Sequence, residues 1–312
     1  MERRRKTINS ALIAKLSSLN CKVLKDENLS KHTSFKIGGA ADFFIEVPSA
    51  LALKKCLEIF KSQDIFILGG GTNILFSDGG FRGIVLKLSG EFKKYSFDGT
   101  KLSCGAAAPL ALVVKEAAQR KLSGLECCFG IPGSVGGAVF GNAGSANESI
   151  SQVIESVEIY PYSNGRHCRQ DLQSPNDAIV LDKSAINFQY RKSGIAAIIA
   201  KINFSLKNEV KNDILDLLSQ SIEKRKKTQP INQPSAGCVF KNPVGFSAGK
   251  LIDEAGLKGK TIGGAQISEV HANFIVNQGG AKAEDVLRLI KIVKTEIKKK
   301  FNIDLEMEIV IA

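Results

Sequence analysis

Aromatic residues are scarce in this sequence, and no apolar run is long. The longest apolar run, residues 195–200, falls far short of the roughly 18 residues that a membrane-spanning helix needs. The basic N-terminus is followed by only a brief apolar segment, which Lys15 interrupts, so no signal peptide is indicated. We therefore expect a cytoplasmic protein that has no membrane partner.

The cysteine pattern argues against two common structural devices. The chain contains seven cysteines, an odd number, and no two of them form a CxxC pair. This pattern is not typical of a disulfide framework or of a zinc site. We expect reduced thiols and no bound metal.

The positive charge points to an anionic partner. The formal net charge is +12, partly gathered in short runs such as residues 223–227, and charge alone does not choose between nucleic acid and a phosphorylated small molecule. The chain has no tryptophan, and its four tyrosines do not interleave with the basic runs to form a stacking surface. A basic nucleic-acid-binding protein is therefore the weaker alternative, and we expect no nucleic acid.

The remaining composition describes a folded chain of several domains. Apolar residues make up 44% of the 312 residues, and 29 glycines lie mostly in clusters. A chain of this length usually forms two or three domains. Strand and helix patterns alternate up to about residue 206, where a long amphipathic helix follows, so we place a domain boundary there.

Periodicity and capping residues predict the main elements. Ser49 is a suitable helix cap, and Pro109 suits a first helical turn. The expected helices cover residues 10–19, 49–63, 109–121, a stretch from about 210 to the segment before Pro230, 247–255 and 284–300. The expected strands cover residues 43–47, 65–68, 84–88, 153–162, 198–206, 274–277 and 305–311.

Two glycine-rich segments occur in the first part, LGGGTNIL at 68–75 and GIPGSVGGAVFGNAG at 130–144. Consecutive glycines leave backbone N–H groups open to close approach by an anion. The first segment is neither a G-x-G-x-x-G helix opening nor a Walker A loop. Because one domain holds both segments, we expect an extended ligand, a nucleotide with a pyrophosphate and an aromatic ring system.

Six motifs in order give the chain a resemblance to a known family. They are HTSFKIGG (32–39), LGGGTNIL, GIPGSVGGAVFGNAG, FQYRKS (188–193), SAGCVFKNP (235–243) and LEMEIVI (305–311). Each motif alone is weak, but together and in this spacing they resemble the UDP-N-acetylenolpyruvoylglucosamine reductases, the MurB family. The strand at 198 follows FQYRKS with no room for a longer loop, which resembles the shorter, second type of the family.

The resemblance implies an α+β fold. A two-lobed FAD-binding portion of the PCMH, or vanillyl-alcohol-oxidase-like, type would cover residues 1–206, with its lobes split near residue 88. A smaller α/β substrate-binding domain would cover residues 207–303, and the last strand, 304–312, would return to the FAD-binding portion. A monomer is favoured.

The resemblance also implies the ligands and the residues that bind the cofactor. FAD would be bound noncovalently, and NADPH would supply the hydride that reduces the enolpyruvyl group of a UDP-sugar to give UDP-N-acetylmuramate, a cell-wall precursor. The residues expected at FAD are Ile37, Gly38, Gly39, Gly69, Gly70, Gly71, Thr72, Asn73, Gly130, Ile131, Pro132, Gly133, Ser134, Gly136, Gly137, Gly141, Asn142 and Gly144.

Three residues take catalytic roles by their motif positions. Hydride transfer to C3 of the enolpyruvyl group leaves negative charge on C2 and the carboxylate. Arg191 and Glu308 are assigned to stabilising that charge, and Cys238 to giving C2 its proton. The family usually has serine at this position, and a thiol can also donate a proton. Strand alternation alone does not separate Glu308 from Glu306, which stays the alternative.

The substrate contacts expected are Tyr190, Arg225, Lys241 and Asn242; Asn242 follows from its family position and Arg225 from charge alone. His32 is a candidate for covalent attachment of flavin, although a capping or packing histidine is the preferred interpretation. Among enzymes, the alternative function is that of a flavin oxidase of the same fold that acts on a small alcohol.

Overall fold

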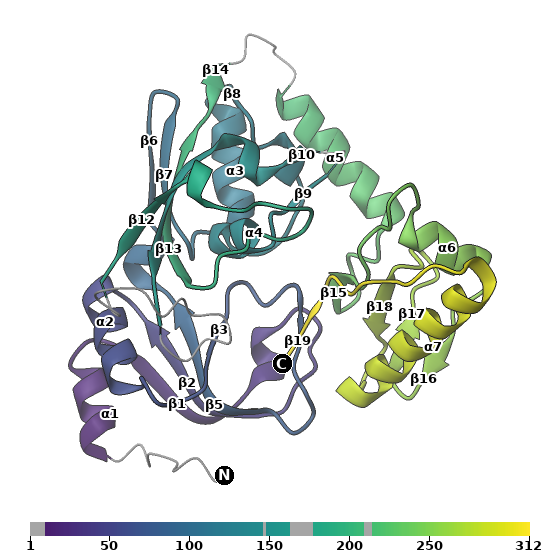
Figure 1. Ribbon diagram of the computed structural model, residues 1–312, viewed down its shortest axis with the longest axis horizontal. Helices are drawn as coiled ribbons and strands as arrows, with labels where there is room; N and C mark the ends of the chain where they lie inside the picture. The colour runs from purple at the N-terminus through teal and green to yellow at the C-terminus, as the bar shows by residue number, and fades with distance from the viewer. Residues whose placement is uncertain (1–9, 146–147, 163–176, 209–213) are drawn as a thin grey trace. The chain divides into compact units, whose positions relative to one another are not determined.

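The computed structural model describes residues 10–145, 148–162, 177–208 and 214–312, and Figure 1 shows its helices and strands. The chain forms two compact units, each with its own hydrophobic core. Unit 1 comprises Met1–Glu27, Ala41–Gly70 and Arg82–Ser219, and unit 2 comprises Asn28–Ala40, Gly71–Phe81 and Gln220–Ala312. Both units therefore combine segments that are distant in the sequence.

The first sheet of unit 1 has four strands in the order β1-β2-β5-β3. Their bounds are β1 (Lys22–Asn28), β2 (Ala40–Val47), β5 (Phe81–Leu88) and β3 (Ile65–Ile67), and β3 runs parallel to β5. Helices α1 (Ser10–Ser17) and α2 (Ala50–Ile59) belong to the same unit. As expected, Ser49 caps α2, since its Oγ accepts a hydrogen bond from the N–H of Ala52 at 3.2 Å.

The second sheet of unit 1 has five antiparallel strands in the order β12-β11-β13-β7-β6. Their bounds are β12 (Ile179–Asp182), β11 (Ile154–Tyr160), β13 (Ile198–Ser205), β7 (Lys101–Gly105) and β6 (Tyr95–Asp98). Figure 1 shows helices α3 (Leu110–Gln119) and α4 (Val135–Phe140) beside this sheet. One core joins side chains from both sheets, which fixes α4 and the glycine-rich segment that contains it.

Short elements connect these layers. They are the 3₁₀ helices η1 (Leu29–His32), η2 (Gly90–Lys93), η3 (Glu126–Cys128), η4 (Ile150–Val153) and η5 (Lys183–Ala185), and the strands β8 (Leu122–Ser123), β9 (Gly144–Ser145), β10 (Glu148–Ser149) and β14 (Lys207–Asn208). Strand β9 pairs with β10, and β14 pairs with β8.

Unit 2 contains a four-stranded antiparallel sheet with the strand order β15-β18-β17-β16. Their bounds are β15 (Ser235–Cys238), β18 (Phe274–Asn277), β17 (Ala265–Ile267) and β16 (Thr261–Ile262). Helices α6 (Ala248–Glu254) and α7 (Ala283–Phe301) bury their apolar sides in the core of this unit. The last strand, β19 (Val310–Ile311), pairs in parallel with β4 (Ile74–Leu75).

The N-terminus of α7 is capped from a distant part of the chain. The carboxylate of Asp78 accepts hydrogen bonds from the N–H of Ala283 at 2.8 Å and of Glu284 at 3.1 Å. A carboxylate at this end of a helix satisfies open N–H groups and complements the helix dipole. The segment Gly71–Phe81 is thus an integral part of unit 2.

The structure bears out most elements and corrects one. The sheets and helices confirm an α+β chain, and β18 has the predicted bounds. The last strand is wrong in length, because only Val310–Ile311 forms a strand and the residues before it pair through an isolated bridge at Met307. Helix α5 is described as Ile214–Thr228, and the expected start near 210 lies outside the described residues.

The compact units divide the chain differently from the expected domains. One division falls between Ser219 and Gln220, inside α5, and two N-terminal segments join unit 2. The domain limits at 206 and 303 stay predictions. Within the described ranges, no helix is long and apolar enough to span a membrane.

Candidate active site

The two glycine-rich segments meet within unit 1. A Cβ atom on Gly70 would lie 2.5 Å from the Cα of Gly133, and one on Gly69 would lie 2.9 Å from the Oγ of Ser134. Because backbone cannot yield as a flexible side chain can, only glycine at position 70 permits this approach. The structure brings together two segments that the sequence assigned to one ligand.

Open backbone donors lie where the two segments meet. Gly69 and Gly70 are exposed, and the N–H groups of Gly69, Gly70 and Gly133 donate to no acceptor in the described part of the chain. Backbone N–H groups that point away from their own secondary structure bind anions such as phosphate. This part of unit 1 therefore fits the pyrophosphate of a dinucleotide.

The glycines around α4 have two different explanations. A Cβ on Gly136 would lie 2.6 Å from the Cβ of Ala106, and one on Gly144 would lie 2.0 Å from the carbonyl oxygen of Glu148, so both glycines serve protein packing. Gly137 and Gly141, one helical turn apart, have no backbone neighbour closer than 3.6 Å. The side of α4 that bears Gly137 and Gly141 is thus the part that a flat ligand could approach.

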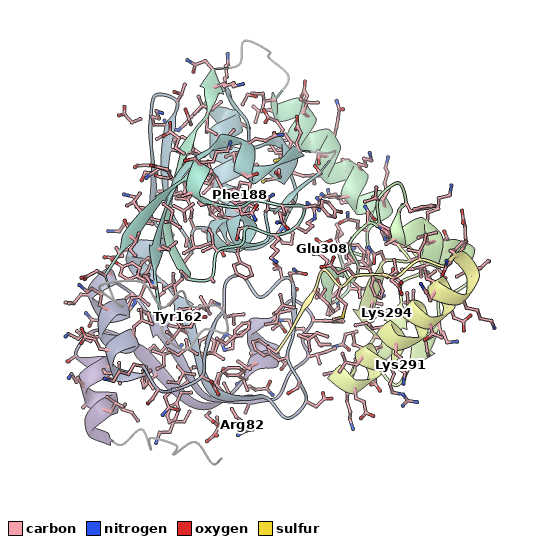
Figure 2. The ribbon with its side chains drawn as sticks, viewed as in Figure 1. Arg82, Tyr162, Phe188, Lys291, Lys294 and Glu308 are labelled. Carbon is pink, nitrogen blue, oxygen red and sulfur yellow. The ribbon has the colours of Figure 1, made fainter. Side chains whose placement is uncertain are left out.

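A turn from a different part of unit 1 brings Arg191 to the same glycine-rich segment. Phe188, labelled in Figure 2, lies just before this turn. The Nη2 of Arg191 donates to the carbonyl oxygen of Gly144 at 2.8 Å, and its guanidinium lies 5.1 Å from the ring centroid of Tyr190. Two residues predicted for catalysis and substrate binding are therefore neighbours of a predicted FAD-binding segment.

In unit 2, the first predicted FAD-binding motif is largely explained by packing. The side chain of Ile37 is buried in the core of unit 2. A Cβ on Gly38 would lie 2.8 Å from the Cβ of Phe76, and one on Gly39 would lie 2.3 Å from the carbonyl oxygen of Asp78. Gly71 has φ +68°, and a Cβ there would lie 2.0 Å from the carbonyl oxygen of His32. These glycines are required whether or not a ligand is bound.

Asn73 contacts the C-terminal segment on both sides of residue 309. Its Nδ2 donates to the carbonyl oxygen of Glu308 at 3.0 Å, and its own carbonyl accepts from the N–H of Val310 at 3.1 Å. Thr72 precedes it and is half-buried. One predicted FAD-binding residue is therefore bonded directly to the backbone of a predicted catalytic residue.

The backbone of Glu308 also joins the strand that carries Cys238. Its N–H donates to the carbonyl oxygen of Val239 at 2.8 Å, and Figure 2 shows Glu308 on the segment that leads to β19. Cys238 is half-buried, whereas the other described cysteines are buried. Burial raises the pKa of the Cys104 thiol to about 12, so this core thiol is poorly reactive at neutral pH.

The structure gives Glu306 a different environment from Glu308. Its Oε1 lies 2.6 Å from the Nζ of Lys241, and its side chain is 73% exposed. Glu308, in contrast, is half-buried. This ion pair accounts for the presence of Glu306 without a catalytic role. It also gives the ammonium group of Lys241, which was predicted to contact the substrate, a partner within the protein.

The other two predicted substrate residues have partners within unit 2. The Oδ1 of Asn242 accepts from the N–H of Ala248 at 2.9 Å, close to the Ser247 cap of α6. The Nη1 of Arg225 lies 3.5 Å from the Oε1 of Gln229, the residue that follows the end of α5. Neither contact needs a substrate, so their assignment stays a prediction.

One residue that supports the site was missed from the sequence. Asn273 is buried, its Oδ1 accepts from the N–H of Phe240 at 2.9 Å, and its Nδ2 donates to the carbonyl oxygen of Phe240 at 2.8 Å. This amide fixes the backbone two residues after Cys238. Nothing in the sequence around Asn273 signalled it, because the two residues are joined only by the fold.

Comparisons with known proteins cover nearly the whole chain. Residues 229–312 match the family described as UDP-N-acetylenolpyruvoylglucosamine reductase, C-terminal domain, and residues 41–170 match the FAD binding domain. The chain is 41% identical over 301 residues to the UDP-N-acetylenolpyruvoylglucosamine reductase of Clostridium botulinum (strain Okra / Type B1), covering 93% of this chain and 92% of that protein. It is 38% identical over 293 residues to UDP-N-acetylenolpyruvoylglucosamine reductase 2 of Symbiobacterium thermophilum, covering 92% and 91%.

A solved structure gives the same result. The crystal structure of the UDP-N-acetylenolpyruvylglucosamine reductase (MurB) from Thermus caldophilus superposes with a TM-score of 0.78 at 37% identity, covering 93% of this chain and 98% of that one. Among the described residues, no group of histidine, cysteine, aspartate and glutamate could hold a metal ion. The chain belongs to the UDP-N-acetylenolpyruvoylglucosamine reductase family and is an FAD-dependent oxidoreductase.

Proposed function

We propose that this protein uses NADPH and FAD to reduce the enolpyruvyl group of UDP-N-acetylglucosamine enolpyruvate, which gives UDP-N-acetylmuramate. The contact of Gly69 and Gly70 with Gly133 and Ser134 carries the proposal, because it joins two segments with open N–H groups into one anion-binding surface. The names of the family members supply the substrate class.

The chain's own residues fit a noncovalently bound FAD. The open N–H groups of Gly69, Gly70 and Gly133 suit the pyrophosphate, and the open side of α4 at Gly137 and Gly141 suits a flat ring. FAD held there would supply the hydride-transfer chemistry, from NADPH to C3 of the enolpyruvyl double bond.

Arg191 is proposed to bind the substrate carboxylate. Its guanidinium is planar and permanently charged, so it can contact both carboxylate oxygens and stabilise the negative charge that develops on hydride transfer. Tyr190, which stacks against this guanidinium, is 52% exposed and is proposed to line the same part of the site.

Cys238 and Glu308 are proposed to complete the reduction. The Sγ–H of Cys238 gives its proton to C2, so that C3 has gained a hydride and C2 a proton. Glu308 helps to stabilise the charge that forms before this proton arrives. Its half-burial and its backbone bonds to Val239 and Asn73 support the choice of Glu308 over the exposed, ion-paired Glu306.

The proposal also includes the type within the family, the location of the protein, its oligomeric state and its further substrate contacts. Only residues 193–197 lie between β13 and the turn that Gln189 and Lys192 close, which supports the shorter, second type. The cytoplasmic location, the monomeric state and the substrate contacts of Arg225, Lys241 and Asn242 stay predictions.

An anaerobic spectral titration tests the proposal. Purified protein should show the absorption bands of oxidised flavin, NADPH should bleach them, and the enolpyruvyl UDP-sugar should restore them without oxygen. Release of FAD on acid precipitation would confirm that it is noncovalent. Protein that takes up no FAD, or reduced flavin that the UDP-sugar leaves unchanged, would overturn the proposal.

The same experiment distinguishes the flavin oxidase. An oxidase would be reduced by a small alcohol and reoxidised rapidly by air, with no effect of the UDP-sugar. We expect reduction by NADPH and reoxidation by the UDP-sugar instead.

A further inference from the structure

Asn142 occupies a position where helices usually have glycine. Helix α4 ends at Phe140 with Gly141 as its cap, and Asn142 follows with a left-handed φ of 42°. The N–H of Asn142 bonds to the carbonyl of Val139 at 3.1 Å and that of Ala143 to the carbonyl of Ala138 at 2.8 Å, the two bonds of a Schellman motif. Asparagine tolerates this conformation less readily than glycine, so its side chain calls for an explanation.

One half of that side chain has a clear task. The Nδ2 of Asn142 donates to the carbonyl oxygen of Gln189 at 2.8 Å. Because a carbonyl can only accept, this contact also fixes which end of the amide is nitrogen. Asn142 therefore joins the end of α4 to the segment that carries Arg191.

The other half of the side chain is unsatisfied. Asn142 is 6% exposed, and its Oδ1 is the buried side-chain oxygen or nitrogen that has no hydrogen-bond partner among the described residues. Buried polar atoms are nearly always paired with protein, ordered water or ligand. The oxygen is therefore available to a donor beyond the described residues, such as a bound ligand.

The segment across from Asn142 is a tight turn. Gln189 and Lys192 exchange backbone hydrogen bonds at 2.8 and 3.1 Å, and Arg191 between them has a left-handed φ of 56°. Glycine or asparagine normally fills such a position, so an arginine there is strained. Contacts from outside the turn must hold this conformation.

Three hydrogen bonds tie the turn to the segment from Phe140 to Gly144. The Nδ2 of Asn142 binds the carbonyl of Gln189, the Nη2 of Arg191 binds the carbonyl of Gly144, and the N–H of Ser193 binds the carbonyl of Phe140 at 3.0 Å. The position of the Arg191 guanidinium thus depends on the same segment that is proposed to contact FAD.

We propose that Asn142 is a positioning residue that couples FAD binding to the placement of Arg191. The inference rests on the proposed function in one respect, that FAD occupies the glycine-rich segment. An N–H or O–H donor of the flavin half of FAD binds the Oδ1 of Asn142. The amide is then held at both ends, its Nδ2 stays on Gln189, and the strained turn keeps Arg191 in place for the substrate.

A titration of the FAD-free full-length protein tests the first half of the proposal. Asn142→Gly removes the amide and suits the left-handed backbone. Two analogues each lack one possible donor: 3-methyl-FAD lacks the ring N–H, and the 2′-deoxyribityl analogue lacks a ribityl O–H. Wild-type protein should bind one of the two about tenfold more weakly than FAD, a difference of about 1.4 kcal/mol. Asn142→Gly should bind FAD about tenfold more weakly and no longer distinguish it from that analogue.

Hydrogen exchange tests the second half without any turnover. The amides of Gln189 and Lys192 report on the turn, because they form its two cross-bonds. Saturating FAD should slow their exchange about tenfold in wild type and leave it unchanged in Asn142→Gly. If Asn142 only stabilised the fold, Asn142→Gly would speed the exchange of these amides by the same factor with and without FAD.

A matched control is available in unit 2. Asn302 is also an asparagine in the left-handed conformation at the end of a helix, with φ 58° at the cap of α7. Asn302→Gly should keep the FAD affinity within twofold of wild type and should still show slower exchange of the turn on FAD binding.

The outcomes separate this inference from the proposed function. An Asn142→Gly variant with wild-type FAD affinity, unchanged discrimination of the analogues or normal slowing of the turn overturns the inference alone. Equal binding of FAD and both analogues by wild type also overturns it. Wild-type protein that binds FAD but leaves the enolpyruvyl UDP-sugar unreduced overturns the proposed function. The FAD titration and the hydrogen-exchange experiment still decide whether Asn142 couples FAD binding to the turn.

Discussion

Arg191 in unit 1 and Glu308 in unit 2 are held in place by different means. Arg191 lies on a strained turn that side-chain hydrogen bonds attach to a glycine-rich segment. Glu308 lies on an extended segment whose backbone N–H and carbonyl are both bonded, to Val239 and Asn73. The placement of Arg191 depends on side-chain hydrogen bonds to a loop, whereas Glu308 is held by two hydrogen bonds to its own backbone.

This contrast predicts how substitutions divide the reaction. Changes at Cys238 and Glu308 should leave FAD binding intact and damage the later steps, because their surroundings are fixed by the fold. A change at Gly137 should weaken FAD binding itself, whereas Arg191→Lys should leave FAD binding nearly intact and slow the reduction of the substrate.

The largest effect is expected at Cys238. Loss of a proton donor typically costs about 10²–10⁴-fold in rate, so Cys238→Ala should be reduced by NADPH normally but should fail to turn over the UDP-sugar. Stopped-flow absorbance resolves the two half-reactions. Cys238→Ser is the control and should remain active, since a hydroxyl can also give the proton.

Alkylation gives an independent reading of the same residue. Iodoacetamide should abolish turnover of wild type, the enolpyruvyl substrate should protect it, and Cys238→Ser should resist the reagent because the other described cysteines are buried. A fully active Cys238→Ala enzyme would remove Cys238 from the mechanism.

A smaller loss is expected from Glu308→Gln, about 10²-fold in kcat, as for removal of one group that stabilises developing charge. Glu306→Gln is the matched control on the same segment. It breaks only an exposed ion pair with Lys241, so its kcat should stay within about twofold. Similar losses in the two variants, or a greater loss for Glu306→Gln, would show that the wrong glutamate was assigned.

Arg191→Lys should lose about tenfold to a hundredfold in kcat. Lysine keeps the charge but cannot form the two-point contact with a carboxylate, and a hydrogen bond to a charged group contributes about 1.5–3 kcal/mol. FAD affinity should change little, which fluorescence titration measures. Unchanged kcat would show that Arg191 does not contact the reacting group.

The smallest effect on the protein itself is expected at Gly137. Gly137→Ala should change the free energy of unfolding of the FAD-free protein by less than about 1 kcal/mol, because the gain in helix propensity is opposed by the close approach of the added Cβ to the Ser134 hydroxyl at 3.3 Å. The added methyl group should nevertheless weaken FAD binding.

Gly136→Ala provides the comparison for this variant. Its Cβ would meet that of Ala106 at 2.6 Å, so it should destabilise the protein by about 1–3 kcal/mol in urea unfolding. If Gly137→Ala binds FAD as wild type does, the flavin does not lie against α4.

Local features of the sequence predicted much of the fold. Ser49 marked the start of α2, and periodicity predicted helices at residues 247–255 and 284–300, where α6 and α7 occur. These signals act within a few residues, so they can be read without a structure. The last strand was overestimated because alternation indicates a possible buried face, here realised at Leu305 and Ile309, and not how many residues find a partner strand.

The site was predictable only as separate motifs. Glycine spacing indicated two ligand-binding segments, but the contact of Gly70 with Gly133 and the bond of Asn142 to Gln189 join residues far apart in sequence. The same holds for the placement of residues 71–81 in unit 2. Such pairings are decided by how the sheets assemble, and a single sequence carries no local signal for them.

The Asp78 cap of α7 has a consequence for synthesis of the chain. Asp78 precedes Ala283 by 205 residues, and at about 5–20 residues per second the ribosome needs roughly 10–40 s to make the interval. Throughout that time the segment around β4 lacks β19, its parallel partner, and α7, the helix that Asp78 caps. Unit 2 therefore completes its folding only after β19 has been synthesised, and a fragment that begins at residue 220 would lack both the Asp78 cap and β4, the strand that pairs with β19.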